Sequence, residues 1–325
     1  MTLPENTTCW VVTDGKAGME SQCLGLAESL GLSPVVKRVR LRSPWRQLSP
    51  WFRAGLSRAF ADDVLAPPWP DLLFASGRLS VPASLYVRAQ SVKAGKPTFT
   101  VQVQDPVIDP ANFDAVVAPL HDGLSGSNVI ATKGALHRVT AGLIAEGAQQ
   151  LKPRLGELRR PYIGVLVGGG NGAFRLGPEE ICTFASRLAA LALAMEASLI
   201  VTPSRRTGKQ NTLLLGQSLA GTRAFVWDGT GANPYFGILG LADQLVVTAD
   251  SVNMITEACA TGKPVHIYDL PGRSRKGMLF RSALIGADHA RKFSVPLASY
   301  EVRPLREMDD VARTIEERYR TFLPR

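Results

Sequence analysis

The chain is poor in the residue types that build disulfide frameworks and zinc sites. Its 325 residues include only four cysteines and four histidines. The histidines have no metal-ligand spacing, so the sequence predicts no metal site. The cysteines are far apart, lie mostly in apolar segments and form no C-x-x-C pair, which predicts reduced, buried thiols at Cys9, Cys23, Cys182 and Cys259.

Long apolar runs are also missing. No run approaches the roughly 20 residues that a membrane-spanning helix needs. The first residues, MTLPENTTCW, lack the basic start and apolar core of a signal peptide. With 45% hydrophobic and 20% charged residues, the composition is typical of an ordinary folded protein. We therefore expect a cytoplasmic protein.

One segment contains no acidic residue, although the chain as a whole carries a formal charge of +9. The segment lies between Glu28 and Asp62, and Lys37–Phe60 within it combines arginines with aromatic residues. Such a combination is typical of a peripheral membrane surface, where each Lys or Arg contributes about 1 kcal/mol. It predicts an anionic membrane surface as partner, on the inner face of the membrane. The alternative is a loop that packs its tryptophans inward while the arginines are solvated. No nucleic-acid motif is present, so no nucleic-acid partner is expected.

The order of apolar segments predicts an α/β fold. Short buried strands alternate with helices, which favours mainly parallel sheets. A chain of this length exceeds the size of a single core. The apolar periodicity stops at Lys152–Pro161, a segment rich in proline, glycine and charged residues. We therefore expect two Rossmann-like domains facing across a cleft, residues 1–155 and 156–305, and a last helix within residues 306–325 that returns to the first domain.

The segment Gly240–Leu270 reads as strand, loop, helix, turn and strand. The strands are expected at Leu245–Val247 and Val265–Ile267, and the helix at Ser251–Ala260. Ligands of open α/β sheets collect at the carboxyl ends of the strands. Ser251 and Asn253 are therefore expected beside a ligand, at a helix start whose N–H groups point at it.

Two further strand ends carry candidate binding residues. Gly168, Gly169, Gly170 and Asn171 form a glycine loop whose backbone can approach a diphosphate. The alternative is a tight turn without a ligand. The next strand ends in a cluster of hydroxyls and cations suited to phosphate oxygens, which can stabilise a leaving nucleoside diphosphate without a metal: Ser204, Arg205, Arg206 and Lys209. A solvated basic turn is the alternative there.

The first half supplies candidates for chemistry on an acceptor. Asp14 and Asp105 follow predicted strands and are candidate general bases for an acceptor hydroxyl. Lys16 and Arg78 are candidate cations for an acidic acceptor. The alternative for Asp105, which precedes a proline, is a turn residue.

The segment Gly240–Leu270 resembles the signature of GT-B glycosyltransferases, especially the enzyme that transfers N-acetylglucosamine onto a lipid-linked peptidoglycan precursor. The resemblance implies that Glu257, followed by Ala258, takes the ribose hydroxyls of a nucleotide sugar; a carboxylate suits a vicinal diol. Where that signature has a Gly-containing turn, this chain has Asp250. Glu257 as a solvated helix residue is the alternative.

Five ordered motifs resemble a second family, the elongated-mitochondria or mitochondrial-fission proteins. They are TDGKAGM at 13–19, SGR at 76–78, VQDP at 103–106, TPSRRTG at 202–208 and ADSVNMITEA at 249–258. Plant members are linked to recruiting a dynamin-like GTPase at the mitochondrial outer membrane, which implies an adaptor.

Two classes of function remain open. The first is a metal-independent glycosyltransferase of the GT-B type that needs no cofactor, uses a nucleotide-sugar donor and takes a lipid-linked or anionic acceptor; a nucleotide-sugar epimerase is a close variant. The second is a non-catalytic, membrane-associated adaptor that keeps the fold. Fold alone does not decide between them.

Overall fold

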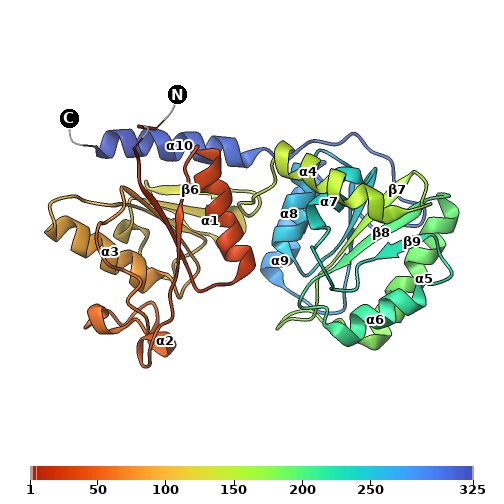
Figure 1. The fold of residues 1–325 in the computed structure, drawn as a ribbon, viewed down its shortest axis with the longest axis horizontal. Coiled ribbons are helices and arrows are strands. Elements are labelled where there is room, and N and C mark those ends of the chain that lie inside the picture. The colour runs from red at the N-terminus through yellow and green to blue at the C-terminus, as the bar shows by residue number, and fades with distance from the viewer. Residues whose placement is uncertain (1–2, 5, 324–325) are drawn as a thin grey trace. The chain divides into compact units, whose positions relative to one another are not determined.

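The computed structural model describes residues 3–4 and 6–323, and the chain forms two compact units (Figure 1). Unit 1 comprises Met1–Arg138 together with Arg306–Arg325, and unit 2 comprises Val139–Leu305. Each unit contains one six-stranded sheet in which neighbouring strands run parallel. The predicted class, two Rossmann-like α/β domains with mainly parallel sheets, is confirmed.

The sheet of unit 1 has the order β2-β1-β3-β4-β5-β6. Its strands are β1 (Cys9–Thr13), β2 (Val35–Arg38), β3 (Leu72–Ser76), β4 (Phe99–Val103), β5 (Ala115–Pro119) and β6 (Val129–Thr132). Its helices are α1 (Ala17–Ser29), the short α2 (Trp45–Leu48), α3 (Val81–Lys93) and α10 (Glu307–Phe322). The chain leaves β1 toward β2 on one side and continues through β3 on the other, so the order reverses between β1 and β3.

The sheet of unit 2 repeats this plan in the order β12-β11-β10-β7-β8-β9. Its strands are β7 (Tyr162–Val167), β8 (Ser198–Pro203), β9 (Ala224–Val226), β10 (Gln244–Thr248), β11 (Val265–Tyr268) and β12 (Arg291–Lys292). Its helices are α4 (Ala141–Leu151), α5 (Pro178–Ala194), α6 (Lys209–Ser218), α7 (Tyr235–Leu241), α8 (Val252–Ala260) and α9 (Arg275–Gly286). Here the order reverses between β7 and β10.

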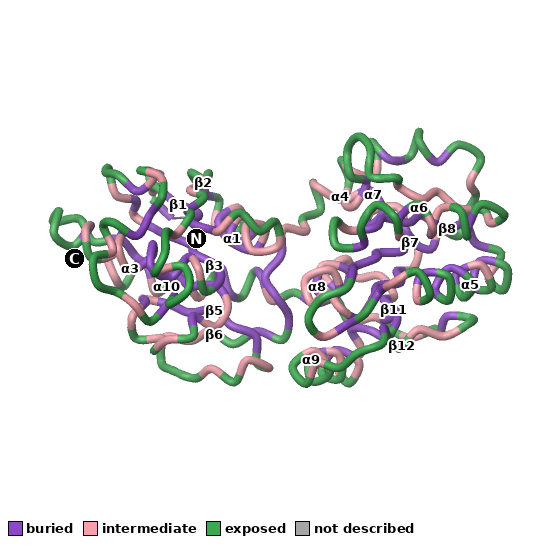
Figure 2. The backbone as a smooth tube through the Cα atoms, turned by 90° about the horizontal axis from the view of Figure 1, so that it is seen from below, coloured by how far each residue is buried: buried purple, intermediate pink, exposed green. Residues whose placement is uncertain are grey.

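The inner strands are almost fully buried because helices cover both faces of each sheet, as the purple strands of Figure 2 show, whereas the edge strands β2, β6, β9 and β12 are partly exposed. Apolar side chains fill separate clusters on the two faces. The helix α10 belongs to unit 1, where its buried side chains recur with helical spacing and pack with Val11, Phe74 and Val101: Met308, Val311, Ala312, Ile315 and Tyr319.

The division between the units falls between Arg138 and Val139, earlier than the boundary after residue 155 expected from the sequence. The reason is α4, a helix that the sequence reading missed. It packs against α7 backbone to backbone: a Cβ at Gly147 would lie 2.6 Å from the Gly237 nitrogen, and one at Gly240 would lie 2.7 Å from the Ile144 oxygen. This tight crossing ties α4 to unit 2.

The cysteine expectation is wrong at one position. All four thiols are free, but Cys182 on α5 is exposed, whereas Cys9, Cys23 and Cys259 are buried. Burial raises the pKa of these three thiols. No helix in residues 3–4 and 6–323 is long and apolar enough to cross a membrane. Over the same residues, no three His, Cys, Asp or Glu side chains are grouped so that they could hold a metal ion.

Candidate functional site

The candidate site of unit 2 lies where the strand order reverses, between β7 and β10. These strands are direct neighbours, with Leu166 paired to Val247. The glycine loop that follows β7 therefore meets the residues that follow β10. The Gly168 N–H donates to the Thr248 hydroxyl over 2.8 Å, and the Gly169 N–H donates to the Asp250 carboxylate over 3.0 Å. Such a reversal is where open α/β sheets bind their ligands.

The Asp250 side chain is fully buried and forms an ion pair with Arg206 within the site. One carboxylate oxygen accepts from the Thr248 hydroxyl at 2.7 Å, and the other accepts from the Arg206 guanidinium at 2.7 Å as well as from Gly169. A Cβ at Gly168 would lie 2.2 Å from the carboxylate oxygens. Glycine is therefore required there, because the carboxylate fills the space beside the loop. This negative charge is compensated by Arg206.

The loop that follows β8 holds the glycine loop from the other side. The hydroxyls of Ser204 and Thr207 both donate to the Gly168 carbonyl, the first over 2.9 Å. Ser204 and Arg206 are thus tied into the architecture of the site. In the described part of the chain, Arg205 and Lys209 are exposed and form no ion pair, so they are the cations of this loop that remain available to an anion.

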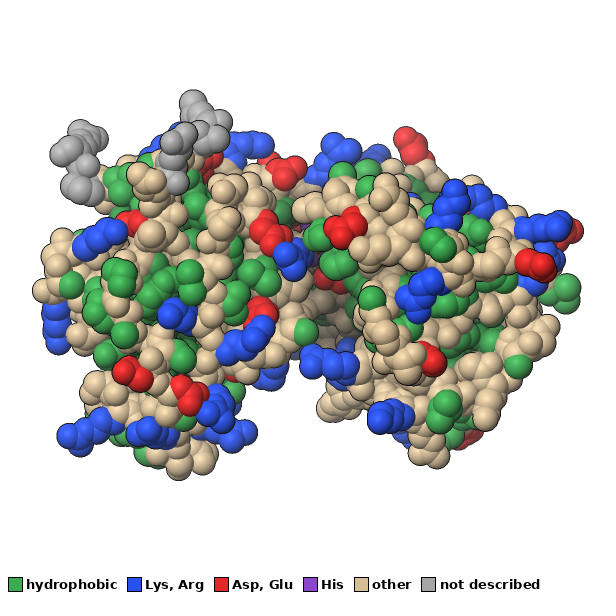
Figure 3. Space-filling view, in the orientation of Figure 1, with side chains coloured by type: hydrophobic (Ala, Val, Ile, Leu, Met, Phe, Trp, Pro, Cys, Tyr) green, Lys and Arg blue, Asp and Glu red, His purple; other side chains and the backbone are tan. Residues whose placement is uncertain are grey.

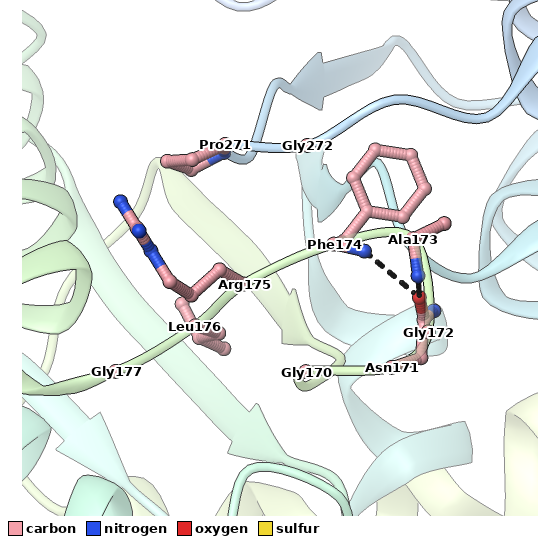
Figure 4. Close-up of a pocket in the computed structure, with 10 residues that line it drawn as sticks. All are labelled: Gly170, Asn171, Gly172, Ala173, Phe174, Arg175, Leu176, Gly177, Pro271 and Gly272. Carbon is pink, nitrogen blue, oxygen red and sulfur yellow. Dashed lines mark hydrogen bonds between the residues drawn. The ribbon is translucent and has the colours of Figure 1, made fainter.

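The outer half of the glycine loop borders an open cavity of about 820 Å³, lined by residues 170–177 with Pro271 and Gly272 (Figure 4). The Asn171 side chain accepts from the N–H groups of Ala173 and Phe174, at 2.8 and 3.0 Å. Gly272 has φ +132°, and a Cβ there would lie 2.0 Å from the Ala173 oxygen. Gly170 and Gly172 are both exposed, and a Cβ at Gly172 would meet nothing within 4 Å, so the backbone here is accessible to a ligand.

Arg281 on α9 is a residue that the sequence reading missed. Its side chain is 15% exposed, donates to the Ala249 carbonyl over 3.3 Å and lies 5.5 Å from the centre of the Phe174 ring. It therefore contacts both the end of β10 and the cavity wall. A signal for α9 was present: Ser274 caps the helix by accepting from the Gly277 N–H at 3.0 Å.

The start of α8 contributes three predicted residues. The Ser251 hydroxyl caps the helix by accepting from the Met254 N–H at 3.4 Å, and Asn253 lies in the first turn, partly buried. Glu257, two turns into the helix, is partly buried and accepts a hydrogen bond from the Tyr235 hydroxyl. Tyr235 begins α7, so the sequence order gives no hint of this pairing.

In unit 1 the predicted acceptor residues also lie at carboxyl ends of strands. Asp14 follows β1 and is 10% exposed; its carboxylate pairs with the Lys16 ammonium at 2.6 Å. Arg78 follows β3, where its guanidinium donates to the Ser49 carbonyl over 2.5 Å. Each of these two cations therefore has a partner within unit 1.

Asp105 follows β4 in a strained loop. Its carboxylate accepts from the Val107 N–H at 2.7 Å, closing a local turn. Gln104 and Val107 have φ of +69° and +61°, conformations that are costly for residues other than glycine. Strained backbone of this kind concentrates at functional sites. Asp14 and Asp105 lie at the same edge of one sheet, two strands apart.

Comparison with known proteins decides the family. The family model described as Mitochondrial fission ELM1 matches residues 17–319. The chain belongs to this family. Among its relatives is the Mitochondrial fission protein ELM1 of Arabidopsis thaliana, 24% identical, with 86% of this chain and 79% of that protein aligned. Another is the Uncharacterized protein RP120 of Rickettsia prowazekii (strain Madrid E), 24% identical over 94% of this chain and 97% of that one.

Solved structures share the fold of this ELM1-family chain at low identity. The UDP-GlcNAc 2-epimerase of Methanocaldococcus jannaschii, crystallised with UDP-GlcNAc and UDP, matches with a TM-score of 0.53 and 10% identity, covering 98% of this chain and all of that one. At this identity the match establishes the GT-B-like fold alone.

The Tyr235–Glu257 pair gives this ELM1-family member a pH-dependent group in unit 2. Burial raises the pKa of Glu257 from 4.5 to about 7, which outweighs the opposing effect of the Tyr235 hydrogen bond. Between these pH values the folded protein keeps a proton that the unfolded chain has lost. The contribution of Glu257 to stability is therefore greatest below pH 4.5 and falls as the pH rises to about 7.

We expect Glu257→Gln to remove this dependence, because the amide stays neutral and still accepts from Tyr235. The melting temperature of the variant should exceed that of the wild type by about 10 °C at pH 8 and match it at acid pH. Burial lowers the pKa of His266 to about 4, so this residue makes stability rise with pH. Its effect is the same in both proteins and cancels in the difference between their melting temperatures. A difference independent of pH would contradict the assignment.

Proposed function

We propose that unit 2 binds a nucleotide sugar and that the protein is a metal-independent, GT-B-type glycosyltransferase. One observation carries the proposal: the glycine loop and the polar ends of β8 and β10 meet at the point where the strand order reverses. A site built on three strand ends, with accessible glycine backbone and unpaired cations beside it, suits a diphosphate. A structure of the same fold that holds UDP-GlcNAc and UDP supports this ligand class.

The residues divide into those that hold the site and those that meet the ligand. Gly168, Gly169, Ser204 and Arg206 hold it, together with Asp250. The backbone around Gly170 and Asn171 and the side chains of Arg205 and Lys209 are proposed to contact the diphosphate. Ser251 and Asn253 position the start of α8 beside it, and Glu257 is proposed to accept from the ribose hydroxyls.

The acceptor is proposed to be lipid-linked or anionic and to be handled by unit 1. Asp14 or Asp105 would remove the proton of its hydroxyl. The Asp14 carboxylate lies 2.6 Å from the Lys16 ammonium, so in this scheme the cation stands beside the base. Arg78 acts indirectly in this scheme, because its guanidinium fixes the backbone at Ser49. A peripheral membrane contact through Lys37–Phe60 would bring such an acceptor within reach.

A second candidate is a non-catalytic adaptor, and one observation favours it. The Asp250 carboxylate already occupies the Gly169 N–H, a group that a phosphate-binding loop would offer to its ligand. The adaptor would keep the fold without binding a nucleotide. An epimerase remains a variant of the first candidate.

Thermal shift against nucleoside diphosphates and nucleotide sugars tests the proposal. A ligand at 100 times its dissociation constant adds about 2.7 kcal/mol to stability. We expect Arg205→Ala to weaken the shift and Arg223→Ala, an exposed arginine before β9, to leave it unchanged. Release of nucleoside diphosphate would then be followed to separate transfer from epimerisation. No shift with any nucleotide, from folded protein, would favour the adaptor.

A further inference from the structure

The loop around α2 in unit 1, residues 42–58, exposes large apolar side chains. Trp51 is 62% exposed and Leu48 is 48% exposed. The other aromatic residues of this region turn inward: Trp45 packs on Phe52 with ring centres 5.8 Å apart, and Phe60 is buried in the core. Packing of the tryptophans inward, one of the two sequence alternatives, therefore holds for Trp45 but not for Trp51. Within Lys37–Phe60, the α2 loop is the part that places an exposed tryptophan beside exposed arginines.

The α2 loop is fixed in place rather than loosely attached. The Trp45 indole donates to the Ala54 carbonyl over 2.8 Å. Ser49 exchanges hydrogen bonds with Arg78, its hydroxyl donating to the Arg78 carbonyl over 2.9 Å and its carbonyl accepting from the Arg78 guanidinium. The exposure of Trp51 is therefore a property of an ordered loop.

The basic residues of the region separate into paired and unpaired groups. Arg38 is paired with Glu20, Arg40 is paired with Asp62, and Lys37 lies over the Trp10 ring. Arg42 also lies close enough to Asp62 to help lower the pKa of that carboxyl. Three other exposed arginines of the α2 loop have no acidic partner among the described residues: Arg46, Arg53 and Arg58. Figure 3 shows several Lys and Arg side chains at the end of unit 1 where Figure 1 labels α2, with acidic side chains beside some of them.

We propose that the α2 loop docks on an anionic lipid bilayer, with Trp51 and Leu48 entering the interface and the three unpaired arginines contacting lipid phosphates. Tryptophan prefers the interfacial region because its ring is apolar and its N–H is polar. The arginine forks match phosphate oxygens, and no acidic residue of the loop opposes a negative surface. The inference does not rest on the nucleotide-sugar proposal, since it concerns a surface of unit 1 alone.

Co-sedimentation with vesicles tests the docking. We expect the full chain to bind vesicles that contain phosphatidylglycerol and to bind phosphatidylcholine vesicles far more weakly. Trp51→Ala should reduce the affinity about tenfold. Arg46→Ala with Arg58→Ala should reduce it about 25-fold at low salt, since each arginine contributes about fivefold. Added salt should shrink the arginine effect more than the tryptophan effect.

Matched variants on unit 2 are the controls. Leu193 on α5 is 83% exposed and Arg159 is exposed, so Leu193→Ala and Arg159→Ala remove similar groups from another surface and should leave vesicle binding unchanged. A blue shift of tryptophan emission on adding vesicles should also be lost in Trp51→Phe, which retains binding. Equal loss in the unit 2 variants would overturn the proposal. So would binding to duplex DNA, but not to vesicles, that the α2-loop substitutions abolish.

Discussion

Asp250→Ala is expected to lower the local unfolding free energy of unit 2 by about 3 kcal/mol. The substitution leaves the Gly169 N–H and the Thr248 hydroxyl without their acceptor and removes the ion-pair partner of Arg206. Water does not replace these contacts, because the carboxylate is fully buried. Hydrogen exchange of the amides of β7 and β10 measures this local stability directly. The strands of unit 1 provide an internal reference that should not change.

Two further variants separate the charge from the hydrogen bonds. Asp250→Asn keeps an oxygen acceptor and should lose about half as much. Asp228→Ala removes a carboxylate that also accepts from a backbone N–H and a hydroxyl, both of Thr230, but on the exposed loop after β9. It should destabilise far less than Asp250→Ala, because water replaces the lost hydrogen bonds there. If Asp250→Ala and Asp228→Ala destabilise the protein equally, the Asp250 carboxylate does not hold the glycine loop.

Gly169→Ala is the second change with a large expected effect. Its Cβ would lie 2.3 Å from the carbonyl carbon and oxygen of Arg206, and neither backbone can yield without disturbing the loops after β7 and β8. We expect a loss of about 3 kcal/mol, at the upper end for an overpacked site. Thermal unfolding followed by calorimetry would show this loss as a lower transition temperature.

The same loop contains a matched control. A Cβ at Gly172 would meet nothing within 4 Å, so Gly172→Ala should leave stability unchanged. It should instead weaken the binding of any ligand that approaches this backbone. Comparable destabilisation by Gly172→Ala and Gly169→Ala would show that chain flexibility, rather than contact with Arg206, explains the glycines.

The buried strands were predictable because their apolar runs are short and bounded by turn residues. The strands expected at Leu245–Val247 and Val265–Ile267 are β10 and β11, which differ from the expectation only at their ends. The helix expected at Ser251–Ala260 is α8, which begins one residue later. Because the ends of these strands could be predicted, most candidate residues lie in the loops after strands where the sequence placed them.

The helices α4 and α7 were not predictable from local pattern. Both contain glycines, which disfavour a helix and read as loop. In the fold these glycines allow the two helices to touch, and the gain comes from a contact between segments far apart in the chain. The partners of the site residues escaped prediction for the same reason: nothing local links Tyr235 to Glu257 or Arg206 to Asp250.

The placement of α10 sets an order for synthesis of the chain. The whole of unit 2 is contiguous in sequence, so its core is complete once residue 305 has emerged from the ribosome. Unit 1 begins first but needs Ile315 and Tyr319 of α10 to cover one face of its sheet. Until those residues appear, that apolar face is open to water and to chaperones. The N-terminal unit of this protein is therefore the last to finish folding.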